Sequence, residues 1–229
     1  MTTGSAVTLV RSWRAQVITG IVLLALAGAL GLWVLARGDH PFAVDAWWDA
    51  LLAGSSGHPV LIGFAMVMND VGGTWVAVYL VPLGGALALV IARRPWPAAY
   101  FIAASAASAG GVQLLKHLFG RARPEDILVT ADFGSFPSGH TANAATIAVV
   151  AVLLFPRLWV LIAGSAWVVL MAFSRTYLHA HWLSDTLGGA LLGAGVAFVA
   201  AAAFSAVIVQ DPATPVTDNA PVSVVPPPD

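Results

Sequence analysis

The chain has 229 residues, of which 59% are hydrophobic and only 9% are charged, and its formal net charge is −1. A soluble domain has about 25% charged residues, so this chain lacks the polar surface of a protein that faces water on all sides. The low net charge and the absence of any basic run argue against a nucleic-acid partner. The lack of cysteine excludes disulfides, thiolate catalysis and cysteine-based zinc sites. Composition therefore predicts a single domain within a lipid bilayer.

Long apolar runs along the chain predict helices that cross the bilayer, since a crossing needs about 20 mostly apolar residues. We expect an all-α integral membrane protein with six transmembrane helices, at residues 15–36, 73–92, 97–115, 138–155, 157–174 and 183–209. The first run is also compatible with a cleaved signal peptide, because Ala25-Leu26-Ala27 resembles a cleavage site. Its apolar stretch continues well past that point, which favours a span.

The segment between the first two spans differs in composition. Residues 41–70 combine acidic residues with tryptophans, a mixture typical of one or two helices that lie at the membrane interface. At the end of the chain, residues 210–229 are rich in proline and are expected to form a disordered cytoplasmic tail. The prediction is one membrane-embedded domain, residues 1–209, followed by this tail.

The distribution of basic residues predicts the orientation in the membrane. Six spans place both termini on one side, together with arginines that the positive-inside rule assigns to the cytoplasm: Arg11, Arg14, Arg93, Arg94 and Arg157. Five cations fall on the outer side. Arg37 directly after the first span can be a plain interfacial anchor, and the other four stand against the rule: Lys116, Arg121, Arg123 and Arg175. Charged residues kept near the membrane against the topological bias usually have a function. We therefore expect a site at the outer face of the plasma membrane.

Three polar segments at the outer ends of the spans carry most of these residues, at positions 116–124, 136–141 and 174–185. Lys116, Arg123 and Arg175 would jointly bind a dianion, because arginine pairs with phosphate oxygens and lysine adds a point charge. Ser138 and Gly139 stand where a span begins, and the free N–H groups of a helix start form an anion site. The segments predict phosphoryl transfer, whose catalysis consists mainly of positioning and charge stabilisation.

The histidines of these segments supply candidate reactive groups. His181 and Asp185 are one helical turn apart, so the carboxylate can hold one ring nitrogen and aim the other at phosphorus. His140 could then donate a proton to the leaving oxygen. Spacing alone does not decide which of the two histidines attacks. A purely structural role for the whole set is disfavoured, because the chain is otherwise nearly devoid of charge.

The order and spacing of these residues resemble the three signature motifs of the type 2 phosphatidic acid phosphatase superfamily, which also includes the vanadium haloperoxidases. The family pattern reads K-x6-R-P, then P-S-G-H, then S-R-x5-H-x3-D. This sequence matches each fixed position, with Lys116, Arg123, Pro124, Pro137, Ser138, Gly139, His140, Ser174, Arg175, His181 and Asp185. A haloperoxidase is disfavoured, because that resemblance belongs to soluble enzymes.

The resemblance implies a metal-independent lipid phosphatase that uses no cofactor. In the family pattern, His181 is the nucleophile that forms a phosphohistidine, Asp185 orients it, and His140 is the general acid. The residues that would hold the substrate phosphate are Lys116, Arg123, Ser138, Gly139 and Arg175. The expected partners are a lipid phosphate and the surrounding membrane lipids, and the oligomeric state is left open.

A terminal phosphate does not by itself identify the lipid. Undecaprenyl pyrophosphate, phosphatidylglycerol phosphate and phosphatidic acid all present one, and a polyprenyl pyrophosphate is favoured because Arg121 adds charge for a second phosphate. The alternative is a lipid phosphotransferase that passes the phosphoryl group to an alcohol, and a non-enzymatic transporter or scaffold is a more distant one. Outside the motifs, we expect Gln113 and Asn143 to face the pocket and His179 to lie at the surface, while the role of His117 is open.

Overall fold

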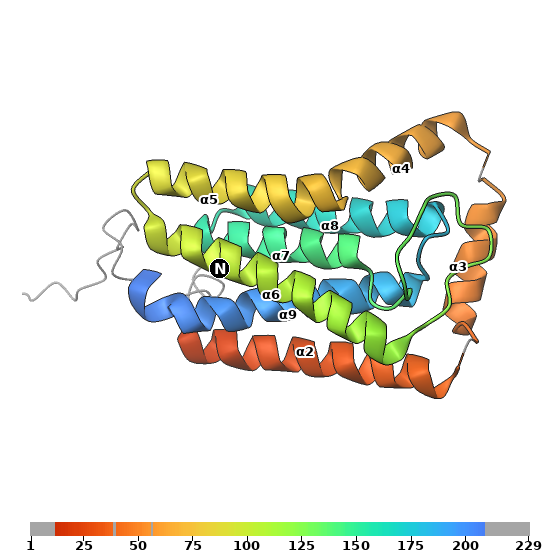
Figure 1. Cartoon of the computed structure of the whole chain (residues 1–229), viewed down its shortest axis with the longest axis horizontal. Helices are drawn as coiled ribbons and strands as arrows, with labels where there is room; N and C mark the ends of the chain where they lie inside the picture. The colour runs from red at the N-terminus through yellow and green to blue at the C-terminus, as the bar shows by residue number, and fades with distance from the viewer. Residues whose placement is uncertain (1–11, 39, 56, 209–229) are drawn as a thin grey trace, which may run out of the picture.

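The computed structural model describes residues 12–38, 40–55 and 57–208. The proline-rich segment 210–229, predicted to be a disordered tail, lies outside the described residues, as does Arg11. All regular structure within the described part is helical, and the long helices run side by side along one axis (Figure 1). The prediction of an all-α fold is confirmed.

Six long elements form the bundle, and each of them corresponds to a predicted span. They are α2 (Trp13–Ala36), α5 (Val81–Ile91) with the π-helix η1 (Thr74–Leu80) before it, α6 (Pro95–Phe119), α7 (Gly139–Leu154), α8 (Leu158–Tyr177) and α9 (Leu183–Ile208). Helix α9 packs against α2, α6 and α7, and α8 packs mainly against α7. The described chain begins in α2 and finishes in α9 at the same end of the bundle (Figure 1).

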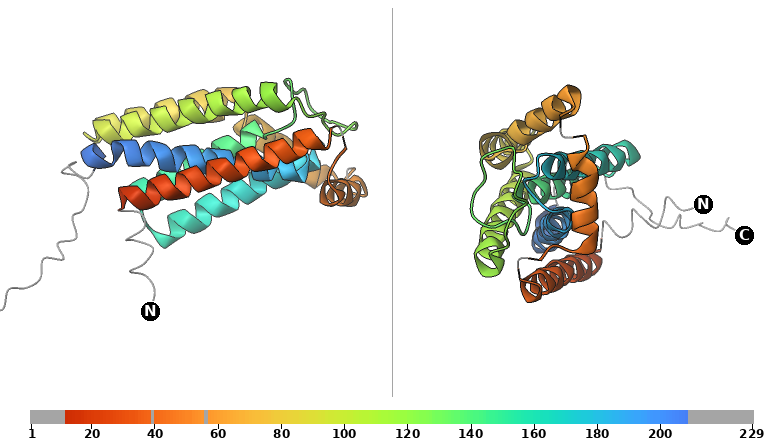
Figure 2. Two further views of the ribbon diagram at one scale, coloured as in Figure 1. Left: turned by 90° about the horizontal axis from the view of Figure 1, so that it is seen from below. Right: turned by 90° about the vertical axis from the view of Figure 1, so that its right-hand side faces the viewer.

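Two shorter helices fill the region between α2 and η1. Helix α3 (Ala43–Ala53) lies across the other end of the bundle, in front of the ends of the long helices (Figure 2). Helix α4 (Pro59–Val71) instead extends the axis of the second span, and the pair is bent by 42° at the break. The two glycines at this break, Gly72 and Gly73, have poor helix propensity.

The lengths of the helices limit how many can cross a bilayer. Among the described residues, four helices are long and apolar enough, namely α2, α6, α8 and α9, and the bent pair raises this number to five. Helix α7 is apolar but has only 16 residues, fewer than the about 20 that a crossing requires. Four or five crossings therefore follow from length and composition, and the sixth stays a prediction.

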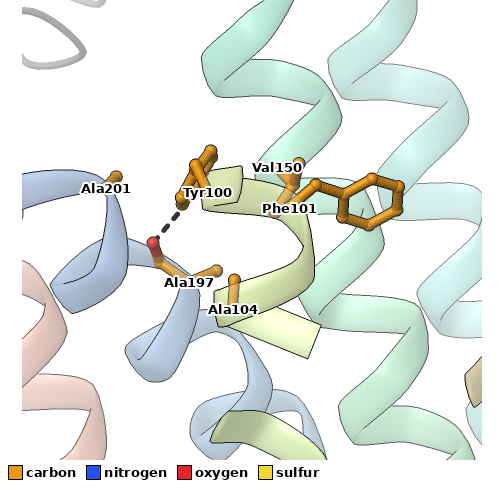
Figure 3. Packing of buried hydrophobic residues seen from close by; sticks show 6 residues of the cluster. All are labelled: Tyr100, Phe101, Ala104, Val150, Ala197 and Ala201. Carbon is orange, nitrogen blue, oxygen red and sulfur yellow. Dashed lines mark hydrogen bonds between the residues drawn. The ribbon is translucent and has the colours of Figure 1, made fainter. Parts of the chain in front are cut away.

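Small residues let the helices approach closely. At the end of the bundle far from α3, Tyr100 of α6 donates a hydrogen bond of 3.1 Å to the backbone oxygen of Ala197 in α9, beside Ala104 and Ala201 (Figure 3). A Cβ atom added to Gly193 of α9 would collide with the backbone of α7. Packing of this kind is typical of membrane helices, where small residues allow close backbone contact.

A long connection between α6 and α7 folds over the end of the bundle that carries α3 (Figure 1). It starts at Gly120, whose φ of +53° is the left-handed conformation that glycine adopts without strain and that ends α6. It finishes at Ser138, whose Oγ caps the first turn of α7 by accepting from Thr141 N. Residues 120–138 thereby reach the ends of α8 and α9.

Candidate active site

The three predicted segments meet at the end of the bundle covered by α3. They line one cavity of about 410 Å³, to which α6 contributes Lys116, the long connection Arg123, α7 His140, α8 Arg175, and the turn between α8 and α9 His181. Gly139 also lines the cavity, whereas Ser138 and Asp185 lie behind its wall and are fully buried. Gln113 and Asn143 are part of the lining, as expected.

The ring of His181 is held by a backbone oxygen. Its Nδ1 lies 2.8 Å from the carbonyl oxygen of Ser135, which can only accept, so Nδ1 carries the proton and Nε2 keeps its lone pair. Arg123 Nη1 lies 3.3 Å from this Nε2. The nearest oxygen of Asp185 is 3.7 Å from Nδ1, beyond hydrogen-bond length. Ser135 is therefore the direct partner of the ring, and sequence reasoning missed it.

Asp185 is the centre of a buried set of hydrogen bonds directly behind His181. Its oxygens accept from Arg121 Nη1 at 2.5 Å, from Ser135 Oγ at 2.5 Å and from the backbone N–H of Trp182 at 2.8 Å. A buried carboxylate is tolerated when its lone pairs are satisfied in this way. Asp185 thus holds Ser135, whose carbonyl oxygen accepts from the ring. It also places its own negative charge 3.7 Å from His181 Nδ1.

Arg121 links Asp185 to the transverse helix α3. Its Nη2 donates to Asp45 of α3 at 2.7 Å, and Nη1 also donates to Ser184 Oγ at 2.7 Å. Asp45 is fully buried and accepts in addition from the backbone N–H of Ser184 at 2.8 Å. The guanidinium of Arg121 is engaged by two carboxylates and does not line the cavity. The expectation that Arg121 adds charge for a second phosphate is therefore wrong.

Helix α4 contributes a residue that sequence reasoning did not single out. His140 Nε2 lies 3.1 Å from the backbone oxygen of Asn69 and donates to it, and Arg175 Nη1 donates to Asn69 Oδ1 at 2.5 Å. Asn69 thus positions both the candidate proton donor and one of the candidate phosphate-binding cations. Asn69 lies in the last turn of α4, directly before the bend of 42° to the following helix.

The cations of the cavity retain donors that protein groups do not use. Within the described residues, the buried Nε–H groups of Arg123 and Arg175 have no hydrogen-bond partner. The first turn of α7, which leaves backbone N–H groups unpaired at its start, borders the same cavity at Gly139. A buried donor without a partner costs free energy, and the N–H groups at the start of α7 are placed to bind an anion in the cavity.

Positive charge around His181 also sets its protonation. Burial lowers the pKa of His181 well below its ordinary value, and the charges of Arg123, Arg175 and Lys116 lower it further. The ring is therefore neutral at physiological pH, which is the state that a nitrogen nucleophile requires. No cluster of three potential metal-binding side chains is found among the residues that the structure describes.

The remaining histidines lie away from the cavity. His179 is almost completely buried, with its Nδ1 2.7 Å from Asp49 of α3, so the expectation of a surface position is wrong. His117 is exposed and stacks on Phe133, with 5.5 Å between the ring centres. These contacts connect α3 and the long connection to the bundle, and neither histidine touches the cavity.

Comparisons with known proteins agree with this geometry. Residues 97–208 match the PAP2 superfamily. An undecaprenyl-diphosphatase of Sulfolobus acidocaldarius is 40% identical over 65 residues, which cover 28% of this chain and 31% of the relative. Phosphatidylglycerophosphatase B of Bacillus subtilis is 38% identical over 91 residues, with 35% and 45% covered. The chain thus spans less than half of the length of each of these two relatives.

Similarity to solved structures extends over more of the chain. A transmembrane PAP2 type phosphatidylglycerolphosphate phosphatase from Bacillus subtilis superposes with a TM-score of 0.66 at 25% identity, covering 80% of this chain and 94% of that one. LpxE of Aquifex aeolicus gives a TM-score of 0.62 at 25% identity, with 71% and 98% covered. The apolar helices and these neighbours identify a multi-pass membrane protein. Its motifs, its fold and the family match together identify residues 97–208 as a PAP2 superfamily region.

Proposed function

We propose that the protein is an integral membrane phosphatase that hydrolyses the terminal phosphate of a lipid phosphate or lipid pyrophosphate. One observation carries this proposal: the unprotonated Nε2 of a neutral, buried histidine lies at a cavity lined by three cations. His181 Nε2 is 3.3 Å from Arg123, and Lys116 and Arg175 line the same space. A phosphate bound there would meet the nucleophile and the three cations.

The chemistry follows from which atoms carry protons. His181 Nε2 attacks phosphorus, a P–N bond forms, and the bond from phosphorus to the leaving lipid oxygen breaks. His140, protonated on both ring nitrogens in this step, gives its Nδ1 proton to that oxygen while Nε2 keeps its hydrogen bond to Asn69. Water then attacks the phosphohistidine, the P–N bond breaks, His140 takes a proton from the water, and inorganic phosphate leaves. Lys116, Arg123, Arg175 and the start of α7 stabilise the charge on the transferred group in both steps.

In this proposal, the residues behind the His181 ring stabilise the phosphorylated intermediate. Phosphorylation of Nε2 makes the imidazole ring positively charged while Nδ1 keeps its proton. The carboxylate of Asp185, 3.7 Å from Nδ1, stabilises this charge, and the Ser135 oxygen fixes the direction of the ring. Arg121 and Asp45 hold Asp185 in place from the side of α3.

The names of the relatives support the class of substrate in this proposal. They name an undecaprenyl-diphosphatase, a phosphatidylglycerophosphatase and a lipid A 1-phosphatase, the last from Rhizobium etli and 28% identical over 79% of this chain and 80% of its own length. What their named substrates share is a terminal phosphate on an amphiphile. We assign that class to this protein. Because Arg121 lies outside the cavity, it gives no reason to prefer a pyrophosphate.

The proposal includes a position in the membrane. The turns at the end of the bundle opposite the cavity carry Arg93, Arg94 and Arg157, and Arg14 lies at the start of α2. By the positive-inside rule that end is cytoplasmic, which puts the cavity at the outer face of the plasma membrane and both termini inside. In this arrangement α7 completes six crossings, and α3 lies along the outer membrane surface.

The experiment measures release of inorganic phosphate by the detergent-purified protein in the presence of EDTA. The substrates are undecaprenyl pyrophosphate, phosphatidylglycerol phosphate and phosphatidic acid. We expect release by the wild type and by H117A, in which an exposed histidine is removed, and no release by H181A. Full activity in folded H181A would refute the mechanism. If the folded wild type released no phosphate but transferred it to an added alcohol, the protein would be a phosphotransferase.

A further inference from the structure

A carboxylate outside the family motifs lies directly on two cations of the candidate site. Asp132 belongs to the connection between α6 and α7. Its Oδ1 accepts from Lys116 Nζ at 2.6 Å and from Arg123 Nη2 at 2.9 Å, and the side chain of Gln113 is hydrogen-bonded to the same carboxylate. The two cations are those to which the proposed function assigns the substrate phosphate. Asp132 and Gln113 line the cavity with them.

The two cations are enclosed, whereas the carboxylate is not. The side chains of Lys116 and Arg123 are 3% and 13% exposed, but that of Asp132 is 55% exposed. Lys116 also donates to the Gly134 oxygen at 3.1 Å, and Arg123 donates to it at 2.8 Å. Both cations therefore keep a protein partner when Asp132 moves away, and the exposed side of Asp132 leaves it room to move.

Asp132 carries a negative charge at neutral pH. Burial raises its pKa, but the hydrogen bond from Lys116 and the charges of Lys116 and Arg123 outweigh burial, so the pKa lies below its ordinary value. An anion that enters the cavity therefore meets a resident negative charge at close range, where repulsion is strong. It must also take over hydrogen-bond donors that Asp132 already uses.

We propose that Asp132 is a specificity-determining residue, a tethered anion that occupies Lys116 and Arg123 until the phosphate of the substrate displaces it. This inference rests on the proposed function. A terminal phosphate has two charges and three free oxygens, so it competes well against one carboxylate. A phosphodiester, the headgroup linkage of bulk membrane phospholipids, has one charge and competes poorly. Asp132 thereby excludes the surrounding lipids, which vastly outnumber the substrate, from the cation pair.

The first test measures anion binding without turnover. Orthovanadate, a phosphate-like anion, is titrated into the detergent-purified full chain, and its dissociation constant is obtained from the rise in the thermal unfolding midpoint. We expect D132N to bind vanadate about tenfold more tightly than the wild type, equivalent to about 1.4 kcal/mol. D126N is the matched control, because Asp126 lies in the same connection, is exposed and does not line the cavity. It should bind vanadate like the wild type, and D132S provides a second neutral variant.

The second test addresses selectivity. Phosphatidylglycerol, a phosphodiester lipid, is added to micelles that contain a lipid phosphate substrate, and phosphate release is measured. We expect it to inhibit D132N at a mole fraction about tenfold lower than the wild type. If the wild type binds vanadate and releases phosphate, but D132N and D132S bind vanadate no more tightly, the inference is overturned and the proposed function stands. A wild type that neither binds vanadate nor releases phosphate from any lipid would overturn both.

Discussion

The Nδ1 of His181 donates its hydrogen bond to the backbone oxygen of Ser135, 2.8 Å away, and not to Asp185, whose nearest oxygen is 3.7 Å away. The direction of the ring is thus fixed by the main chain of the connection between α6 and α7. In the proposed mechanism, the carboxylate acts mainly through its charge and through its hydrogen bonds with Ser135 and Arg121. This division of roles leads to different expectations for the individual side chains.

Replacing the nucleophile and replacing the carboxylate behind it should have unequal effects. H181A should abolish phosphate release, because no nitrogen remains to form the phosphohistidine. D185N should reduce kcat by on the order of 10³-fold but leave measurable activity, since the backbone of Ser135 still orients the ring. Initial rates with a short-chain lipid phosphate measure both. A D185N protein that is folded and as inactive as H181A would show that the ring depends on Asp185 for its direction.

The side chain of Ser135 should contribute much less to catalysis than its backbone carbonyl does. S135A removes the hydroxyl that donates to Asp185 but leaves the carbonyl that accepts from His181. One lost hydrogen bond to a charged group is worth about 1.5–3 kcal/mol at most, and Arg121 and Trp182 still satisfy the carboxylate. We expect kcat to fall by about tenfold, far less than in D185N. A loss in S135A equal to that in D185N would contradict this assignment.

Asp45 should contribute strongly to stability although it is remote from the cavity. D45N leaves the buried charge of Arg121 with Asp185 alone, and breaking a buried ion pair costs about 3–5 kcal/mol. The comparison is D49N on the same helix, where the carboxylate of Asp49 is 30% exposed and pairs with His179. Thermal unfolding in detergent should show a much lower midpoint for D45N than for D49N. Equal midpoints would mean that the link from α3 to Asp185 does not hold the fold together.

The neutral state of His181 predicts the acid side of the pH profile. Burial and the charges of Arg123, Arg175 and Lys116 lower the pKa of His181 below 6.5, so the ring protonates only at more acid pH. The acid limb of kcat/KM, which reports the free enzyme, should therefore lie below pH 6.5. R123M removes one positive charge, which favours the protonated ring, and should move this limb to higher pH while lowering the maximum. A limb at the same or lower pH in R123M would argue that His181 is not the group that titrates.

The helices could be predicted well from the sequence where apolar runs end in charged residues or proline. The span predicted at 97–115 corresponds to α6, Pro95–Phe119, and that at 183–209 to α9, Leu183–Ile208. The junction of α4 with the second span could not be predicted in this way. A bend of 42° at two glycines depends on what the segment packs against, and hydropathy carries no information on it.

The site itself was predictable as far as its motifs reach. The motifs named Lys116, Arg123 and His181, and the packing of α6, α8 and α9 brings these three residues to one cavity. Their hydrogen-bond partners, and those of the neighbouring arginines, lie far away in the sequence. Asp45 is 76 residues from Arg121, and Asn69 is 106 residues from Arg175. Such contacts arise only once α3 and α4 are placed against the bundle, so the burial of Arg121 could not be read from its position beside Arg123.

The close contact between α7 and α9 restricts how this chain can vary. A Cβ atom at Gly189 or Gly193 would run into the backbone of Ser138 or Ala142, so a side chain there must push α7 away from α9. That movement would separate His140 from His181 without altering either. Many apolar residues on the outside of the bundle are exposed and can exchange among themselves. At these two glycines, in contrast, only a residue without a side chain fits, so the spacing of the two candidate catalytic histidines depends on atoms that are missing there.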